Sequence, residues 1–231
     1  MEMSKELRHL RELVLGKTPS ENARTLMAAL SLAGCAFMWR DNLKLRREVQ
    51  ALRESEHILE HQALHDPLTD LPNRAMFMDS LNRALSHGRR HGHPVGILFL
   101  DLNGFKQVND MYGHETGDQV LRVAAERLRL SVRPEDMVSR YGGDEFAILL
   151  SDITSEEQLA EIAQRLVRRL SAPIRLHDRD VALSASIGYA LGSPAEVSAE
   201  ELVRRADLHM YREKVQDRDH TLQNGVWAVG D

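Results

Sequence analysis

The fold is decided by the stretch Arg140-Tyr141-Gly142-Gly143-Asp144-Glu145-Phe146. Its two glycines stand between two apolar runs, and a Gly-Gly pair in that setting predicts a tight hairpin, because both central residues of such a turn need φ > 0. The hairpin presents Asp144 and Glu145 at its tip. Glycines let a bulky ligand approach the backbone, and two carboxylates beside them can hold a hard cation. The pattern fits a metal-bound nucleotide phosphate, with an ordinary acidic surface turn as the alternative.

A further carboxylate ends the strand that precedes this hairpin in the sequence. Residues 95–100 form a nearly continuous apolar run after Pro94, which is typical of a central strand covered on both faces. The run ends at Asp101, where an ionised carboxylate is a poor structural choice unless it binds something. The alternative is an aspartate that caps the next turn. A glycine-containing turn at Gly104 and a helix start follow, and such a junction presents free backbone N–H groups to a phosphate.

The remaining patterns complete a domain. A helix with Phe77, Leu81 and Leu85 on one face should end near Gly88, and a later helix should follow Thr154 and Glu157, which have capping-box spacing. Residues 181–189 alternate as a strand, and a last helix should run from a second capping box, Ser198 and Glu201, to about Tyr211. The element order predicts an α/β (α+β) fold in which helices flank a central mixed, mostly antiparallel sheet.

The N-terminal part has a different character. Residues 25–39 carry no charge, but as a helix they would span only about 22 Å, short of a hydrocarbon core of ~30 Å. They are either a membrane anchor or a buried or dimer-forming helix. From Asn42, leucines at 45, 52 and 59 follow a heptad, which indicates a short parallel coiled coil or a solvated connector. We therefore expect a helical segment at 1–41, a coiled-coil linker at 42–63, a domain at 64–219 and a tail at 220–231.

Composition limits the possible partners and settings. A net charge of −5, spread over ions of both signs, gives no basic stripe, so we expect no nucleic-acid polymer as a partner. The single Cys35 has neither a disulfide partner nor zinc-ligand spacing. A reducing cytoplasm is the simplest setting. If residues 25–39 touch lipid, the protein would be tethered to the inner face of the cell membrane.

With these motifs the chain resembles the GGDEF family, the diguanylate cyclases that condense two GTP molecules into cyclic di-GMP. The resemblance covers roughly residues 61 to 219 and extends beyond the hairpin. Three further motifs appear in the family's order: Asp-x-x-x-Phe-Lys-x-Val-Asn-Asp from Asp101, Gly-His-x-x-Gly-Asp from Gly113, and Ala-Asp-x-x-x-Tyr-x-x-Lys from Ala206. The family's domains look like the palm of nucleotide polymerases. The resemblance implies a homodimer, because one domain holds one GTP and the new bond joins two.

The resemblance also implies roles for individual residues. Asp101, Asp144 and the Leu102 carbonyl would bind Mg²⁺ or Mn²⁺, and Glu145 would be either a further ligand or the base that deprotonates the attacking hydroxyl. Asn109 with Asp118 would read guanine, whose N1–H and N2 amino group call for acceptors. The phosphates would be bound by residues of three segments: Gly104, Phe105 and Lys106; Gly142 and Gly143; Lys214 and Arg218. The alternative for Lys214 and Arg218 is a solvated basic helix face.

Arg133 and Asp136 match the family's inhibitory product site by their fixed offset from the hairpin. An arginine fork can bind a guanine edge or a phosphate, and an aspartate can accept a guanine N–H pair. We therefore expect cyclic di-GMP as both product and inhibitor. Asn103, Asp217 and Asp219 depart from the family pattern, yet none is one of the expected metal carboxylates. The alternative function is a catalytically inactive receptor for GTP or cyclic di-GMP on the same fold.

Overall fold

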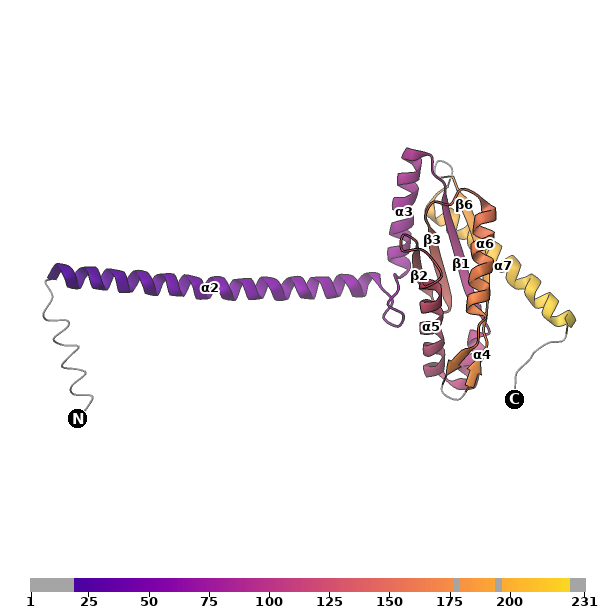
Figure 1. Ribbon diagram of the computed structural model, residues 1–231, viewed down its shortest axis with the longest axis horizontal. Coiled ribbons are helices and arrows are strands. Elements are labelled where there is room, and N and C mark those ends of the chain that lie inside the picture. The colour runs from indigo at the N-terminus through magenta and orange to yellow at the C-terminus, as the bar shows by residue number, and fades with distance from the viewer. Residues whose placement is uncertain (1–18, 177–178, 194–196, 225–231) are drawn as a thin grey trace. The chain divides into compact units, whose positions relative to one another are not determined.

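The computed structural model describes residues 19–176, 179–193 and 197–224. The chain divides into two compact units, Met1–Leu59 and Glu60–Asp231. The predicted boundary at residue 64 lies close to the start of the second unit, which holds the whole sheet (Figure 1).

Helix α2 (Pro19–Leu64) is continuous through both the apolar stretch and the predicted coiled-coil linker. The heptad leucines Leu45, Leu52 and Leu59 are 59%, 69% and 62% exposed in the single chain, so the described part of the chain leaves this seam uncovered. Within the ranges described, no helix has both the length and the hydrophobicity needed to cross a bilayer. The coiled-coil linker stays a prediction.

The second unit is built on a four-stranded sheet in the order β2-β3-β1-β6. Every pairing in this sheet is antiparallel, and the parallel component is an isolated bridge between Asn73 and Arg140. The strands are β1 (Val95–Asn103), β2 (Met137–Gly142), β3 (Glu145–Leu150) and β6 (Ser184–Gly192), and a separate hairpin pairs β4 (Ile174–Leu176) with β5 (Arg179–Val181). The helices of the unit after α2 are α3 (Arg74–His91), α4 (Phe105–Tyr112), α5 (His114–Arg129), α6 (Glu156–Leu170) and α7 (Ala199–Asn224).

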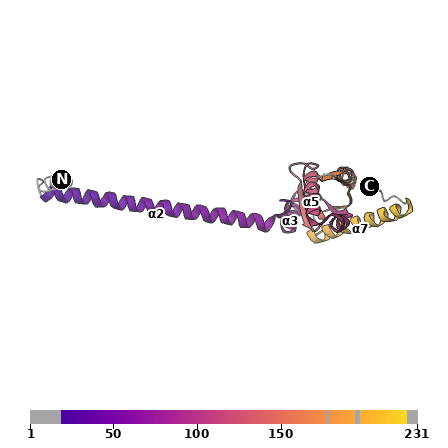
Figure 2. The same ribbon diagram turned by 90° about the horizontal axis from the view of Figure 1, so that it is seen from below.

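Helices cover both faces of the sheet, as the apolar β1 run predicts (Figure 1 and Figure 2). Because side chains of a strand alternate between faces, Leu98 and Leu100 pack toward α5 and α6, whereas Ile97 and Phe99 pack toward α3 and α7. All four side chains are at most 3% exposed. This three-layer arrangement confirms the predicted fold class.

Two strand details differ from the sequence-based expectations. Of the two hairpin glycines expected to take φ > 0, Gly143 does (φ +50°) and Gly142 does not; Gly142 ends β2 and Glu145 begins β3, so the turn is centred on Gly143 and Asp144. The strand expected at 181–189 is β6 at Ser184–Gly192, while Val181 ends β5.

Three helix details also differ. Helix α3 passes Gly88, which is buried within it, and ends at His91, where Gly92 takes the left-handed conformation. The N-cap of α6 is Ser155 rather than Thr154, because the Ser155 hydroxyl accepts the Gln158 N–H while the Gln158 side chain accepts the Thr154 N–H. Helix α7 continues beyond Tyr211 to Asn224. Of the second predicted capping box, the Ser198 hydroxyl accepts the Glu201 N–H, whereas the Glu201 carboxylate pairs with Arg204 and Arg205.

A close contact between β6 and α7 depends on Gly188. A Cβ atom at this position would lie 2.1 Å from both the Ala206 carbonyl oxygen and the Met210 nitrogen, so α7 would have to move away from the sheet. We expect Gly188→Ala to lower the free energy of unfolding by about 2–3 kcal/mol in chemical denaturation. Gly34→Ala is the control, since nothing lies within 4 Å of its added Cβ. An unchanged denaturation midpoint for Gly188→Ala would contradict this packing.

Candidate active site

Two carboxylates of the site face each other across neighbouring strands. The β1 alternation places Asp101 on the same face as Ile97 and Phe99, and Glu145 of β3 is its direct partner in the antiparallel register. The neighbouring hydrogen bond, from Leu102 N–H to the Asp144 carbonyl oxygen at 3.3 Å, makes Asp101 and Glu145 a non-hydrogen-bonded pair, in which side chains come closest. Like charges at such positions are unfavourable unless a cation joins them.

Electrostatics bring Asp144 into the same cluster. Burial raises the pKa of the Asp144 carboxyl, and the nearby Asp101 charge raises it further. Burial likewise raises the pKa of Glu145, and the charges of Asp101 and Asp144 add to this effect. The shared causes place the three carboxylates near one another at this end of the sheet, and the joint binding of one ion by Asp101 and Asp144 stays a prediction.

One lysine partly compensates this negative charge. Lys214 of α7 contacts the Asp101 carboxylate, with 2.5 Å between Nζ and Oδ1, and the two side chains are only 23% and 14% exposed. Lys214 also counteracts the raised pKa of both Asp144 and Glu145. The solvated-face alternative for Lys214 is therefore wrong. Arg218 belongs to the same helix, but its side chain lies outside the described residues, as do those of Asp217 and Asp219.

The donor chemistry fits a hard divalent cation. The site offers carboxylate oxygens of Asp101, Asp144 and Glu145, which suit Mg²⁺ or Mn²⁺. Among the described residues, no three His, Cys, Asp or Glu side chains are grouped so that they could hold a metal ion. Two carboxylates, the Leu102 carbonyl and substrate phosphates would have to make up the coordination shell, as magnesium sites in nucleotide enzymes commonly do. The metal ligands stay a prediction.

The predicted guanine-reading pair, Asn109 and Asp118, lies at the junction of α4 and α5. Gly113, with φ +83°, turns the chain between the two helices, and Gly117 lets them pack closely, since a Cβ there would lie 1.9 Å from Oδ1 of Asn109. Asp118 follows in α5 and is half-buried, as is Asn109. The absence of a side chain at Gly117 therefore places the Asn109 amide beside the helix that carries Asp118.

The predicted phosphate turn begins α4. Gly104 takes φ +80°, which favours glycine, and serves as the helix N-cap. Lys106 is exposed, whereas Phe105 is half-buried against two of the apolar clusters, so its ring has a packing role in addition to the predicted backbone contact. Asn103 just before the turn exchanges hydrogen bonds with the buried Ser186 of β6, at 2.9 and 3.2 Å. Asn103, which departs from the family pattern, thus links β1 to β6 through its side chain.

The predicted inhibitory site has a specific local geometry. The two carboxylate oxygens of Asp136 accept the backbone N–H groups of Arg133 and Ser151, each at 3.0 Å. Asp136 therefore shapes the turn before β2, while the Arg133 side chain is exposed. Of the two residues, Arg133 is the one whose side chain is directed to solvent.

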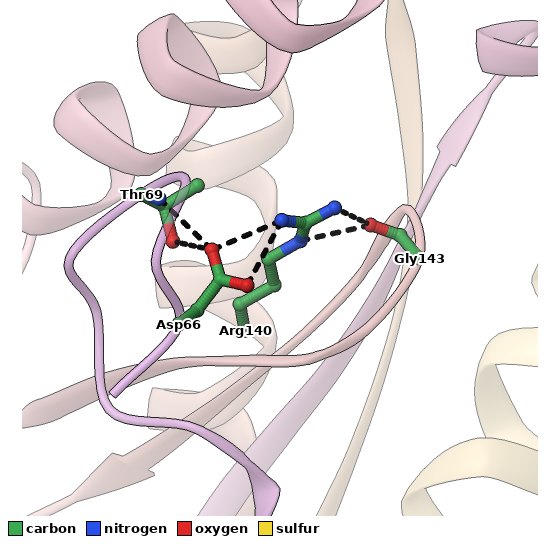
Figure 3. A network of polar contacts seen from close by, with 4 residues as sticks. All are labelled: Asp66, Thr69, Arg140 and Gly143. Carbon is green, nitrogen blue, oxygen red and sulfur yellow. Dashed lines mark hydrogen bonds and ion pairs between the residues drawn. The ribbon is translucent and has the colours of Figure 1, made fainter. Parts of the chain in front are cut away.

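Sequence reasoning missed a polar network beside the hairpin (Figure 3). Nη1 of Arg140 donates to both carboxylate oxygens of Asp66, at 2.9 and 3.0 Å, while its Nε and Nη2 donate to the Gly143 carbonyl oxygen, at 3.0 and 2.8 Å. Asp66 lies in the turn between α2 and α3, a segment to which the sequence analysis assigns no role. The available signal was an arginine two positions before the paired glycines, together with an aspartate that has no evident partner nearby in sequence.

An open hollow of about 640 Å³ lies next to this network. It is lined by Asp66, Arg140 and the two hairpin glycines, and by the start of α3, where Arg74 lies 4.9 Å from the centre of the Tyr141 ring. The hollow therefore shares Gly142 and Gly143 with the predicted phosphate contacts, whereas neither the predicted metal carboxylates nor the predicted guanine-reading pair lines it.

Comparison with known proteins agrees with this geometry. The family model described as "Diguanylate cyclase, GGDEF domain" matches residues 63–220. In Pseudomonas aeruginosa, the bifunctional diguanylate cyclase/cyclic di-GMP phosphodiesterase MucR is 40% identical over 84% of this chain, and the diguanylate cyclase TpbB is 42% identical over 72%. The chain spans only 28% and 39% of the lengths of these two proteins.

A solved structure extends the likeness to the N-terminal side of the domain. The coiled coil and GGDEF domain of DgcB from Caulobacter crescentus, in complex with cyclic di-GMP, is 29% identical, with a TM-score of 0.68, and the match covers 83% of this chain and 95% of that one. Together with the family-model match over most of the chain, the sheet, the hairpin and the acidic cluster lead to one conclusion: this chain belongs to the GGDEF family.

Proposed function

We propose that this protein is a diguanylate cyclase, which condenses two GTP molecules into cyclic di-GMP and releases pyrophosphate. The observation that carries this proposal is the acidic cluster, in which Asp101 and Glu145 face each other across the sheet and Asp144 interacts with both. A pure receptor has no need for opposed carboxylates at this position, since they are unfavourable without a cation.

Bound at Asp101 and Asp144, a Mg²⁺ or Mn²⁺ ion would activate the 3′-hydroxyl of one GTP and neutralise charge on the phosphates. The chain's own residues position the reactants. Asn109 and Asp118 hold guanine, while Lys106 and the Gly104 turn hold phosphate charge. The 3′-oxygen attacks the α-phosphate of the second GTP, pyrophosphate leaves, and a base takes the hydroxyl proton. The 3′-oxygen of the second nucleotide then attacks the α-phosphate of the first in the same way, which closes the ring and releases a second pyrophosphate. Glu145 is suited to act as this base because its raised pKa favours proton acceptance, and its alternative role is that of a metal ligand.

The reaction requires two domains, because each one holds a single GTP. We propose that the active form is a homodimer joined through the heptad leucines of residues 42–63, whose side chains are exposed in the single chain. The similarity to a structure that contains both a coiled coil and a GGDEF domain supports this arrangement. The linker would then bring two domains together with their acidic clusters facing each other.

The direct test is to incubate the purified full-length chain with GTP and Mg²⁺ and to separate the products by chromatography. We expect cyclic di-GMP and pyrophosphate, and no product when EDTA is present. Binding of GTP or cyclic di-GMP without turnover, in both Mg²⁺ and Mn²⁺, would instead identify a receptor and overturn the proposed activity.

We also propose that cyclic di-GMP inhibits the enzyme through Arg133 and Asp136. Arg133→Ala should abolish this inhibition and leave the initial rate unchanged, because the Arg133 side chain is exposed and lies outside the acidic cluster. Initial rates measured over a series of cyclic di-GMP concentrations provide the test. Asp136→Ala is a poorer variant, since it would remove acceptors from two backbone N–H groups. Identical inhibition curves for Arg133→Ala and wild type would refute the proposed site.

A further inference from the structure

Arg140 holds the hairpin tip from one side. Two of its guanidinium nitrogens, Nε and Nη2, donate to the single carbonyl oxygen of Gly143 (Figure 3). This carbonyl belongs to the peptide group that leads directly into Asp144. Gly143 takes φ +50°, and a Cβ at Gly143 would have nothing within 4 Å, so the surroundings of this glycine do not hold it by packing. The orientation of the Asp144 peptide therefore depends on hydrogen bonding.

Asp66 fixes Arg140 in this position. The Arg140 and Asp66 side chains are only 13% and 18% exposed, so the ion pair is largely shielded from water and holds the guanidinium group in one orientation. Asp66 also accepts the N–H and hydroxyl of Thr69, at 2.9 and 2.7 Å. Although burial alone raises the pKa of a carboxyl, these hydrogen bonds from Thr69 and Arg140 outweigh burial and lower the pKa of Asp66. Asp66 is thus an ionised anchor with its acceptors in use.

The turn that contains Asp66 is hydrogen-bonded to the last turn of α2. Within the second unit, the Asn73 side chain donates to the Ala63 carbonyl oxygen at 2.7 Å, and the Asn73 N–H donates to the Leu64 carbonyl oxygen at 2.8 Å. The Arg140 N–H donates to the Pro72 carbonyl oxygen at 2.9 Å. The turn that contains Asp66 is therefore tied at one end to the helix and at the other end to β2.

We propose that Arg140 is a positioning residue: clamped by Asp66, it fixes the Gly143 carbonyl and so orients Asp144 for the chemistry at the acidic cluster. This inference rests on the proposed cyclase function for its kinetic consequence, but the clamp itself is a property of the hairpin. Asn73 is hydrogen-bonded to the last turn of α2, and the neighbouring Pro72 accepts the Arg140 N–H. A movement of this last turn would therefore be passed on to Arg140. A displacement of this turn would reach Asp144 without any contact with the substrate.

The test uses Arg140→Lys and Asp66→Asn in the full-length chain. Lysine keeps the charge but lacks the planar fork that reaches two acceptors at once, and asparagine keeps the shape but loses the charge. Because misplacement of a reacting group by about 1 Å can cost on the order of 100-fold in rate, we expect kcat to fall about 10- to 100-fold in each variant. The KM for GTP should change by less than about threefold, since guanine is read at Asn109 and Asp118. The double variant should be no worse than the poorer single variant, because both act through one carbonyl.

Hydrogen–deuterium exchange supplies a readout that does not depend on activity. Well below the melting temperature, a peptide spanning residues 141–146 should exchange faster in both variants, while β6 should exchange as in wild type. A merely structural role would instead accelerate exchange throughout the sheet and leave kcat per folded molecule unchanged. Arg83→Ala is the matched control, since Arg83 forms an exposed pair with Asp79 on α3 and should alter neither readout.

The outcomes separate the clamp from the proposed function. Wild-type kcat together with unchanged exchange of residues 141–146 in Arg140→Lys would overturn the inference. Faster hairpin exchange with wild-type kcat would overturn the positioning role while leaving the clamp in place. If wild type itself forms no cyclic di-GMP, the proposed function fails, and the exchange data alone decide whether Arg140 fixes the hairpin.

Discussion

Asp144→Asn is expected to lower the rate of cyclic di-GMP formation by about 1,000-fold or more while the domain stays folded. The substitution keeps the shape of the side chain and removes one negative charge from the cluster with Asp101 and Glu145. The charge is needed to hold a divalent cation, and an amide oxygen is a much weaker ligand for Mg²⁺. Product formation in steady state, measured with Mg²⁺ in excess, checks this prediction.

The same variant should make the metal-free protein more stable. The pKa values of Asp144 and Glu145 are raised in the folded state, so the folded protein holds these two protons more tightly than the unfolded chain does. The resulting stability is fully present below the ordinary pKa values, where both groups are protonated, and it is lost as the pH rises through the raised values. At neutral pH with EDTA, both groups therefore oppose folding. Asp144→Asn removes one of these charges, and we expect a gain of roughly 0.5 kcal/mol in the free energy of unfolding.

Asp79→Asn is the control for this stability effect, because Asp79 is an exposed carboxylate paired with Arg83 on α3. It should leave activity intact and change stability by less than about 0.5 kcal/mol. Near-normal activity of Asp144→Asn would show that this carboxylate holds no essential cation. A lower stability of Asp144→Asn in EDTA would show that the repulsion between Asp144 and the neighbouring carboxylates of Asp101 and Glu145 is absent.

Asp118→Ala is expected to raise the KM for GTP about 100-fold, the second large effect. A carboxylate that accepts two guanine N–H donors is worth about 1.5–3 kcal/mol, because its loss leaves polar groups of the base unpaired. Inosine triphosphate, which lacks the N2 amino group, gives the sharper test. Wild type should strongly prefer GTP over inosine triphosphate, whereas Asp118→Ala should treat the two nucleotides nearly alike.

Glu115→Ala provides the matched control for Asp118→Ala. Glu115 lies in the first turn of the same helix, α5, and its side chain is exposed. It should leave both KM values unchanged. If Glu115→Ala lost the preference for GTP as Asp118→Ala is expected to, helix stability would explain the effect and the assigned contact with guanine would be wrong.

Local sequence patterns predicted most of the architecture. The apolar run before Asp101 indicated a strand covered on both faces, and the glycine pair indicated the hairpin between β2 and β3. Both signals are local, because strand burial and turn geometry depend on residues adjacent in the chain. Alternation along β1 also explains why Lys214 of α7 reaches Asp101, since this residue points to the face that α7 covers.

The sequence could not reveal contacts that depend on tertiary register. Asp66 and Arg140 are separated by 74 positions, and no local pattern pairs them. The position of the α6 N-cap depends on neighbouring residues. Thr154 and Ser155 are both good N-cap residues, and Ser155 takes this place because the Gln158 side chain accepts the Thr154 N–H. The continuation of α7 beyond Tyr211 was missed although no glycine or proline interrupts the sequence between Tyr211 and Asn224.

The central claim is that Asp101 and Asp144 bind one divalent ion together. A crystal structure of the protein with Mn²⁺ and a GTP analogue that cannot be cleaved between its α- and β-phosphates tests it most directly, with the ion identified by anomalous scattering. We predict an ion within about 2.0–2.3 Å of a carboxylate oxygen from each of the two aspartates, completed by analogue phosphate oxygens. An ion held by the analogue and only one of these aspartates, or by neither, would contradict the account.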